Sequence, residues 1–224
     1  MSDLKIVIGL GNPGEKYRNT RHNAGYMALA VLAEKKGFND PCRSKKALIS
    51  KGKVEGYPVI LAWPTVYMNL SGSAAAELLN FYKVPLERLL VIHDDMDLPV
   101  GRLKACSGGG SAGHNGLVSL MEEIGEGFDR LRIGIGRPDR AAFGGDWSPY
   151  VLAPFNSLEV EAFDQSLQTA ALASAAWISH GLPTCQRRAN VRPPKPPKEG
   201  QPGGPSEAGS PEPGRLEVPE GRTD

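Results

Sequence analysis

Cysteine is scarce in this chain of 224 residues, and its net charge is small. The three cysteines are Cys42, Cys106 and Cys185, an odd number without a CxxC spacing. This argues against a disulfide framework and against a structural zinc site. The 26 basic residues almost balance the 25 acidic ones. Any surface that binds nucleic acid must therefore be a local patch of positive charge.

Long hydrophobic runs are missing as well. No apolar stretch approaches the length that a membrane-spanning helix needs. The first residues, MSDLKIVIGL, lack the basic region, apolar core and small-residue cleavage site of a signal peptide. Together with the few unpaired cysteines, these absences lead us to expect a soluble, cytoplasmic protein without a membrane partner.

Aromatic residues are absent from the last part of the chain. Residues 191–224 hold nine of the 19 prolines and six of the 27 glycines, but no aromatic side chain. Such a segment buries too little apolar surface to offset the entropy of ordering it. We therefore expect a disordered tail at residues 191–224 and one folded domain at residues 1–190, which is long enough for a sizeable core.

The body of the chain alternates between strand-like and helix-like patterns. Apolar runs such as LKIVIGL and RLLVIH are typical of buried central strands, and Glu55-Gly56 between two further runs indicates a hairpin. The predicted strands are 4–10, 47–54, 57–63, 88–93, 101–106 and 131–135, and the predicted helices are 23–36, 71–83, 115–124 and 158–179. This order predicts an α/β fold: a single-domain three-layer sandwich with a mixed, mostly parallel central sheet flanked by helices.

Three polar segments, GNPGEKYRNTRHNAG, HDDMD and SGGGSAGHNG, follow predicted strands and contain His22, His93 and His114. Ligand crevices of open α/β sheets lie beyond the carboxyl ends of the strands, so we expect these loops to form one site. Histidine is the side chain best suited to proton transfer near neutral pH, and Asp94 is a carboxylate that can orient it. No serine or cysteine stands unambiguously beside them, so water is the expected nucleophile.

Three asparagines, Asn12, Asn69 and Asn115, lie in the segments GNPG, YMNLSG and GHNGL. A carboxamide offers a donor and an acceptor without charge, which suits holding a peptide backbone or stabilising an oxyanion. Asparagine is also common as a turn or helix-capping residue, and that interpretation stays open for each of them.

Other motifs suggest different chemistry. Gly9-Leu-Gly11-Asn-Pro-Gly14 fits a dinucleotide-binding string, but no helix opens at the second glycine, and a turn with positive φ explains the glycines as well. Gly109-Gly-Ser111-Ala-Gly113 matches the nucleophile elbow of serine hydrolases, with His180 as its histidine, but flanking glycines make the match easy to obtain by chance.

A divalent cation is a further alternative. Asp94, Asp95 and Asp97 could supply its ligands. Alternating residues at the end of a strand cannot all face one point, however, so we expect no metal.

Taken together, the strings GLGNPGEKYRNTRHNAG, TVYMNLSG, VIHDDMDLPVG, GGGSAGHNGL and RLRIGIGRP resemble the bacterial-type peptidyl-tRNA hydrolases. The resemblance runs in unbroken order from Leu4 to about Asn190. It implies a single α/β globule, expected to be a monomer, that cleaves the ester between peptide and tRNA after premature drop-off from the ribosome. It implies neither a cofactor nor a metal.

The resemblance also assigns roles to individual residues. His22 matches the catalytic base and Asp94 the carboxylate that orients it. The remaining matched residues are Asn12, Asn69 and Asn115, which hold substrate and the attacking water, Tyr17, Met68 and His114, which line the cleft, and Arg132 with Lys104, which contact tRNA phosphate. His93 has no matched role and is expected to be structural.

The chain departs from the family pattern at a few positions. Cys106 stands where many members have a second basic residue, Asp95 replaces a common glutamate, and the tail exceeds the usual length. Some relatives of this fold are RNA-associated scaffolds instead of hydrolases, and the intact set of His22, Asp94 and asparagines argues against that alternative.

Overall fold

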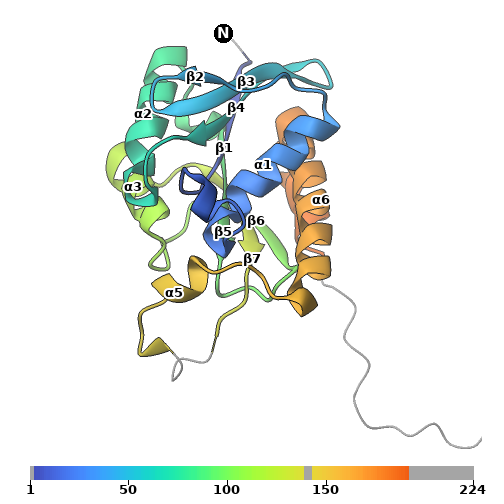
Figure 1. Cartoon of the computed structure of the whole chain (residues 1–224). Helices are drawn as coiled ribbons and strands as arrows, with labels where there is room; N and C mark the ends of the chain where they lie inside the picture. Colours follow the sequence, from blue (N-terminus) through green and yellow to red (C-terminus); the bar gives the residue numbers. More distant parts are fainter. Residues whose placement is uncertain (1–2, 139–142, 192–224) are drawn as a thin grey trace, which may run out of the picture. The chain divides into compact units, whose positions relative to one another are not determined.

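The structure is a computed structural model that describes residues 3–138 and 143–191 (Figure 1). At its centre lies a seven-stranded sheet in the order β2-β3-β4-β1-β5-β7-β6. The strands are β1 (Lys5–Gly9), β2 (Cys42–Ser44), β3 (Ala47–Val54), β4 (Tyr57–Pro64), β5 (Leu89–Asp95), β6 (Leu103–Ser107) and β7 (Asp129–Gly134). β1 pairs in parallel with β4 and β5, and β5 with β7, whereas the pairs β2–β3, β3–β4 and β6–β7 are antiparallel. These pairings confirm the expected mixed, mostly parallel sheet, because only β3 and β6 run against the other strands.

Helices cover both faces of the sheet (Figure 1). Side chains of a strand alternate between the two faces: Val7 of β1 belongs to the apolar cluster with α1 (Ala24–Lys35) and α6 (Ser157–His180). Ile6 and Ile8 belong to the cluster with α2 (Ser71–Tyr82) and α3 (Asn115–Ile124). Apolar burial on both faces explains why the central strands are almost continuously hydrophobic. The three-layer arrangement is therefore confirmed.

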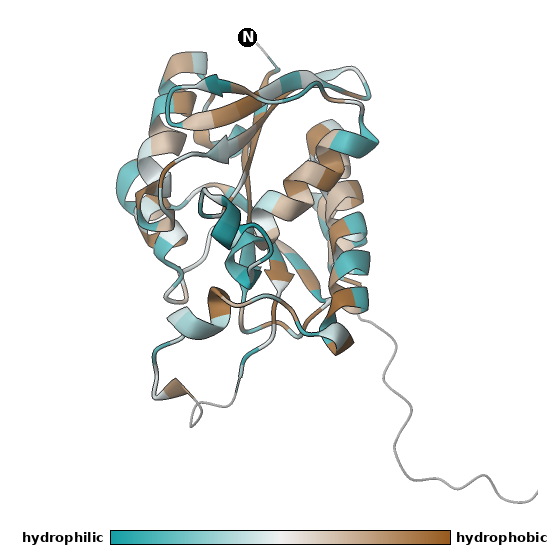
Figure 2. Ribbon diagram, viewed as in Figure 1, coloured by the Kyte–Doolittle hydropathy of each residue, from teal (hydrophilic) through white to brown (hydrophobic). Residues whose placement is uncertain are grey.

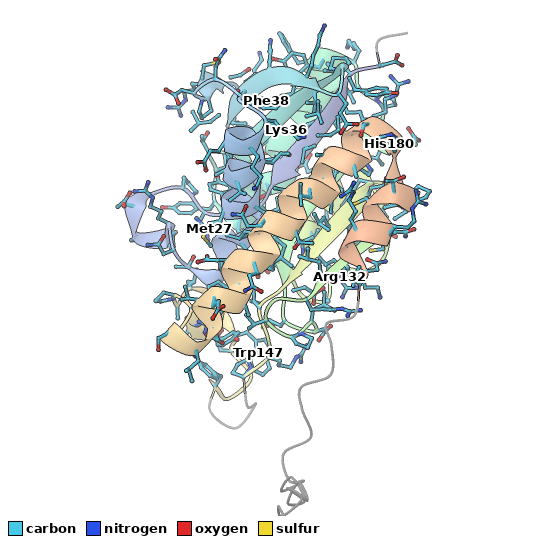
Figure 3. The ribbon with its side chains drawn as sticks, turned by 90° about the vertical axis from the view of Figure 1, so that its right-hand side faces the viewer. Met27, Lys36, Phe38, Arg132, Trp147 and His180 are labelled. Atoms are coloured by element: carbon cyan, nitrogen blue, oxygen red, sulfur yellow. The ribbon has the colours of Figure 1, made fainter. Side chains whose placement is uncertain are left out.

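The helices α6 and α7 (Leu182–Ala189) complete one outer layer, and α6 crosses its face of the sheet diagonally (Figure 3). The sequence did not indicate α7, β2, the short helix α5 (Ser148–Val151) or the 3₁₀ helices η1 (Glu15–Tyr17), η2 (Arg21–Asn23), η3 (Met68–Leu70) and η4 (Leu86–Arg88). Hydrophilic residues colour the short turns between β1 and α1 in Figure 2. None of the described helices has the length and apolarity that crossing a membrane requires.

The glycines of the first loop are needed for close packing. A Cβ on Gly25, at the start of α1, would lie 2.3 Å from the carbonyl oxygen of Ile92 in β5. A Cβ on Gly9 would lie 2.4 Å from the carbonyl oxygen of Gly25, and one on Gly11 would meet the ring of Tyr26. Of the three glycines in the string 9–14, Gly14 has the positive φ of a glycine-bearing turn, whereas Gly9 and Gly11 do not. The missing side chains let α1 begin directly against β1 and β5.

The predicted tail lies almost entirely outside the described residues, of which Val191 is the last.

Candidate active site

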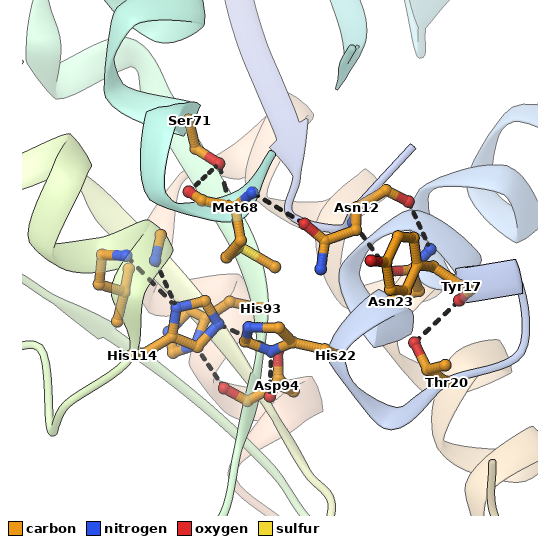
Figure 4. A network of polar contacts seen from close by, with 12 residues as sticks. Asn12, Tyr17, Thr20, His22, Asn23, Met68, Ser71, His93, Asp94 and His114 are labelled. Atoms are coloured by element: carbon orange, nitrogen blue, oxygen red, sulfur yellow. Dashed lines mark hydrogen bonds and ion pairs between the residues drawn. The ribbon is translucent and has the colours of Figure 1, made fainter. Parts of the chain in front are cut away.

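Three polar segments meet beyond the carboxyl ends of the parallel strands β1 and β5, as expected, although β6, the strand before the third segment, runs antiparallel and does not end there. His22 lies on η2, Asp94 is the next-to-last residue of β5, and His114 is the N-cap residue of α3 (Figure 4). The ring centroids of the two histidines are 4.8 Å apart, and Asp94 contacts both rings. We refer to His22, Asp94 and His114 as the His–Asp–His cluster.

His22 is bound tightly to Asp94. Its Nδ1 lies 3.0 Å from each oxygen of the carboxylate, and the two residues are 8 % and 3 % exposed. Burial alone would lower the pKa of His22, but the charge and the hydrogen bond of Asp94 outweigh it and raise that pKa. Burial opposes ionisation of Asp94 in turn, yet contact with the two imidazoles holds its pKa well below the usual range. The pair therefore combines an ionised carboxylate with a histidine whose pKa is raised above its ordinary value.

The hydrogen bonds of His114 determine where its proton lies. Its Nδ1 accepts from the backbone amides of Gly116 and Leu117 at 3.1 and 3.3 Å, which caps α3. Nδ1 must therefore be unprotonated, and Nε2 carries the hydrogen that is donated to Asp94 Oδ1 at 3.0 Å. His114 thus donates to the same carboxylate oxygen, Oδ1, that His22 Nδ1 contacts.

His93 takes no direct part in this cluster. Its Nδ1 donates to the backbone carbonyl of Asp94 at 2.7 Å, and its ring packs edge-on against His114. Complete burial, together with the nearby His114, lowers the pKa of His93 to about 3. The side chain stays neutral at physiological pH, in agreement with the structural role expected from the sequence.

Asn12 joins two of the loops. Its side-chain oxygen accepts from the backbone amide of Met68 at 2.8 Å, and its own amide donates to the side chain of Asn23. The Asn23 carboxamide returns a hydrogen bond to the carbonyl of Asn12 at 3.1 Å (Figure 4). The Asn12 side chain is thus committed at its oxygen, which leaves its NH₂ group for other partners.

Asn69 and Asn115 differ from Asn12, because both are exposed and neither side chain forms a hydrogen bond with the part of the chain that the structure describes. Asn69 follows Met68 on η3, and Asn115 follows the capping residue His114. Tyr17 is half-buried on η1, with the ammonium group of Lys16 4.7 Å above its ring. Two free carboxamides therefore flank the cluster.

A cavity of about 670 Å³ opens beside His22, Asp94 and His114. Its further lining includes the glycine-rich loop 108–113, the arginines Arg130, Arg132 and Arg137, and Trp147. Arg132 and Trp147 are labelled in Figure 3. Asn12, Tyr17, Met68, Asn69 and Lys104 are not part of this lining. The predicted site residues therefore divide between the cavity and the neighbouring group around Asn12 and Met68.

The basic residues in and beside the cavity lie on the neighbouring strands β6 and β7, at one side of the sheet. Lys104 of β6 lies opposite Arg132 of β7, and Cys106 lies opposite Arg130. Arg132 donates from Nε to Asp95. Arg130 is 2 % exposed and donates from Nη1 to the carbonyl of Gly110 at 2.8 Å, which ties down the glycine-rich loop. Cys106 thus occupies the strand next to two arginines.

The three acidic residues at the end of β5 and just beyond it, Asp94, Asp95 and Asp97, do not form a shared cation site. Asp94 contacts the two histidines, Asp95 contacts Arg132, and Asp97 accepts from Arg137 at 2.5 Å. Possible ligand atoms of His22, Asp94 and His114 do lie within 4.8 Å of one another. Of these atoms, His22 Nδ1, His114 Nε2 and the Asp94 oxygens contact one another, and we assign no metal to the cluster.

The motif of a serine nucleophile finds no support in the described residues. The Ser111 hydroxyl accepts from the amide of Gly113 at 3.4 Å, whereas His180 contacts Ser179 and lies 3.9 Å from Glu55. Ser111 consequently has no side-chain contact with a histidine. The glycine-rich string serves the loop that carries His114.

Sequence reasoning missed two arginines. Arg130 anchors the glycine-rich loop, and Arg21 is buried next to His22, but the sequence analysis assigned a role to neither. No local signal marked Arg130, because β7 reads DRLRIG and three of its six residues are charged.

Comparison with known proteins was made for the whole chain. The family model described as "Peptidyl-tRNA hydrolase" matches residues 6–198. The chain is 47% identical over 180 residues to the peptidyl-tRNA hydrolase of Geobacter metallireducens, covering 80% of this chain and 91% of that protein. It is 45% identical to that of Carboxydothermus hydrogenoformans, covering 79% and 93%. The crystal structure of peptidyl-tRNA hydrolase from Acinetobacter baumannii superimposes with a TM-score of 0.76 at 34% identity, covering 85% of this chain and 96% of that one.

Proposed function

The chain belongs to the peptidyl-tRNA hydrolase family, and we propose that it hydrolyses the ester between peptide and tRNA, releasing both after premature drop-off from the ribosome. The observation that carries this proposal is the His–Asp–His cluster at the edge of the cavity. An ester is already activated, so one general base and one oxyanion donor suffice for its hydrolysis.

His22 is the base of the proposed reaction. Because Nδ1 donates to Asp94, Nε2 carries the lone pair, and it forms no hydrogen bond within the described chain. Nε2 accepts a proton from water as that water attacks the ester carbonyl. The Asp94 carboxylate then stabilises the imidazolium, and the same proton passes to the departing ribose oxygen.

Carboxamides hold the substrate around this base. Asn69 or Asn115 supports the tetrahedral oxyanion, because the NH₂ groups of both are free. Asn12 takes part in holding the substrate and the attacking water, and Tyr17, Met68 and His114 line the cleft. The buried hydrogen bond from the amide of Met68 to the side chain of Asn12 fixes Asn12 relative to η3, which carries Met68 and Asn69.

Binding of tRNA rests on the basic edge of the sheet. Arg132, with Lys104 on the neighbouring strand, contacts tRNA phosphate. The protein acts as a cytoplasmic monomer without a metal or a cofactor, and residues 1–190 form its catalytic domain. The tail at 191–224 lies outside this machinery.

A hydrolysis assay with peptidyl-tRNA beside free aminoacyl-tRNA tests the function directly. We expect turnover of peptidyl-tRNA only, and loss of roughly 10²–10⁴ in rate for His22→Ala, the usual contribution of a general base. Ser111→Ala is the matched control, since Ser111 lines the same cavity but lacks a histidine partner. Retained turnover in His22→Ala together with loss in Ser111→Ala would contradict the mechanism, and tRNA binding without turnover by the unaltered protein would contradict the function.

A further inference from the structure

Arg21, the residue before His22, is buried in a set of contacts that reach across the chain. Its side chain is 5 % exposed, and Nη2 donates to Glu159 Oε2 at 2.6 Å. Nη1 donates to the backbone carbonyls of Pro154 at 2.5 Å and Ala153 at 3.4 Å. A planar guanidinium serves the acid and the two carbonyls from two separate nitrogens held in a fixed fork, whereas the three donors of a lysine all lie on one nitrogen.

Aromatic rings complete the surroundings of this guanidinium. Its carbon lies 4.3 Å from the ring centre of Tyr150 and 4.9 Å from that of Phe155. The Tyr150 hydroxyl donates to the carbonyl of Ile135, just after β7, at 2.6 Å. Arg21 is therefore held by rings that are themselves attached to the sheet and to α6.

The backbone of Thr20 and Arg21 also binds the segment before α6. Arg21 donates its amide to the carbonyl of Ala153 at 3.0 Å, and Thr20 forms an isolated antiparallel bridge with Pro154. Glu159 also accepts the amide of Asn156 at 2.9 Å in the capping box that begins α6. One carboxylate thus serves both the turn that carries His22 and the start of α6.

The residues just before Ala153 and Pro154, the carbonyl partners of Arg21, form one wall of the cavity. Gly145, Asp146, Trp147, Ser148 and Val151 line it, and Tyr150 lies on α5 between the last two. The turn with the base and this wall are consequently joined through one buried side chain.

We propose that Arg21 is a positioning residue, which fixes His22 relative to Asp94 and to the 145–151 wall of the cavity. The proposal rests on the proposed role of His22 as base. Arg21 does not touch the reacting atoms in this scheme. It prevents η2 from shifting, and a displacement of about 1 Å at a reacting group is enough to reduce the rate by about 10²-fold.

The pH dependence of the reaction reports this positioning. The titratable groups that face the His22 ring are Asp94 from β5 and His114 from the start of α3, and His93 lies behind His114. Burial lowers the pKa of His22, and only the contact with Asp94 raises it. If η2 shifts and this contact lengthens, the acid limb of kcat/KM moves to lower pH.

Arg21→Gln tests the proposal, with Arg18→Gln as the matched control. Arg18 lies in the same turn and also pairs with a glutamate, Glu15, but that pair is exposed. For Arg21→Gln we expect kcat for peptidyl-tRNA to fall about 10- to 100-fold, KM to change little, and the acid limb to move to lower pH. Arg21→Lys, which keeps the charge but not the planar fork, should recover part of kcat. Arg18→Gln should match the unaltered protein.

Glu159→Gln provides a second route if Arg21→Gln fails to fold. It keeps an acceptor for Asn156 and removes the charge that faces Arg21, so we expect a smaller loss of kcat with the same direction of pH shift. Unchanged kcat and an unchanged acid limb in either folded variant, with only a lower melting temperature, would overturn the proposal. Turnover that survives His22→Ala would instead overturn the role of the base, so the two failures are distinguishable.

Discussion

Replacing Asp94 by asparagine changes one atom of the cluster and removes its only permanent charge. In the native site the carboxylate accepts from His22 Nδ1 and from His114 Nε2, each at 3.0 Å. A carboxamide oxygen at the position of Oδ1 still accepts from both imidazoles, but the NH₂ group then stands at the position of Oδ2, 3.0 Å from His22 Nδ1. The substitution preserves volume, which keeps the packing of β5 intact.

The size of the effect follows from the charge of the imidazolium that forms during the reaction. Opposite charges about 4 Å apart attract by about 4 kcal/mol at an effective dielectric constant of about 20. The imidazolium develops only as the water is deprotonated, so this attraction stabilises the transition state and not the ground state. Its loss reduces kcat by about a thousandfold.

The Asp94→Asn substitution should also shift the pH profile of the reaction. The reaction needs neutral His22, so activity rises as pH increases through the pKa of this residue. Asp94 raises that pKa above the ordinary value, while burial lowers it. In Asp94→Asn only burial remains, so the acid limb of kcat/KM moves to lower pH although the maximal rate falls.

The assay is single-turnover hydrolysis of peptidyl-tRNA between about pH 5 and 8, the range in which histidine titrates. Asp97→Asn is the matched control, because Asp97 is an exposed carboxylate that pairs with Arg137 and does not touch His22. A rate for Asp94→Asn within tenfold of the native rate, or an acid limb at the native position, would refute the reasoning.

Three further predictions concern tRNA binding, metals and the tail. Arg132→Ala should lower kcat/KM for peptidyl-tRNA and reduce by about one unit the slope of its logarithm against the logarithm of salt concentration. Lys53→Ala, at an exposed position of β3, should leave this slope unchanged. An unchanged slope in Arg132→Ala would show that Arg132 does not contact phosphate. Dialysis against a chelator should leave kcat unchanged, because the ligand-type atoms of the His–Asp–His cluster are bound to one another, whereas a loss restored by zinc would assign an ion to this cluster. Truncation after Asn190 should leave kcat/KM within a fewfold of the full chain, and a large loss would show that residues 191–224 contact substrate.

Much of the fold could be predicted because each central strand carries its own signal. Runs such as Ile6–Ile8 are apolar on both faces, and this pattern is specific to strands buried between two layers of helices. The rule that ligands bind beyond the carboxyl ends of parallel strands then placed His22, after β1, beside Asp94, at the end of β5. His114 reaches the same site for a different reason, because β6 before it runs antiparallel and its loop leads back to the start of α3. Helix α7 escaped notice because it is only eight residues long and buries only two small side chains, Cys185 and Ala189.

Contacts between distant positions were not predictable in the same way. The bond between Asn12 and the Met68 amide spans 56 residues, and that between Arg21 and Glu159 spans 138. No local pattern encodes such partners, because the path of the whole chain brings them together. The same holds for Gly25, whose missing side chain matters only because β5 happens to lie 2.3 Å from where a Cβ would stand.

The capping bond of His114 has a consequence for where protons can reside. Three histidines lie together here: His22 and His114 contact the Asp94 carboxylate, whereas His93 is too deeply buried to become charged, with a pKa of about 3. A second proton on His114 would require Nδ1 to release the amides of Gly116 and Leu117, and so to uncap α3. His22 is left as the single member of the trio that can store a proton without disturbing the backbone, so each proton removed from water has one defined carrier and one defined route back to the leaving group.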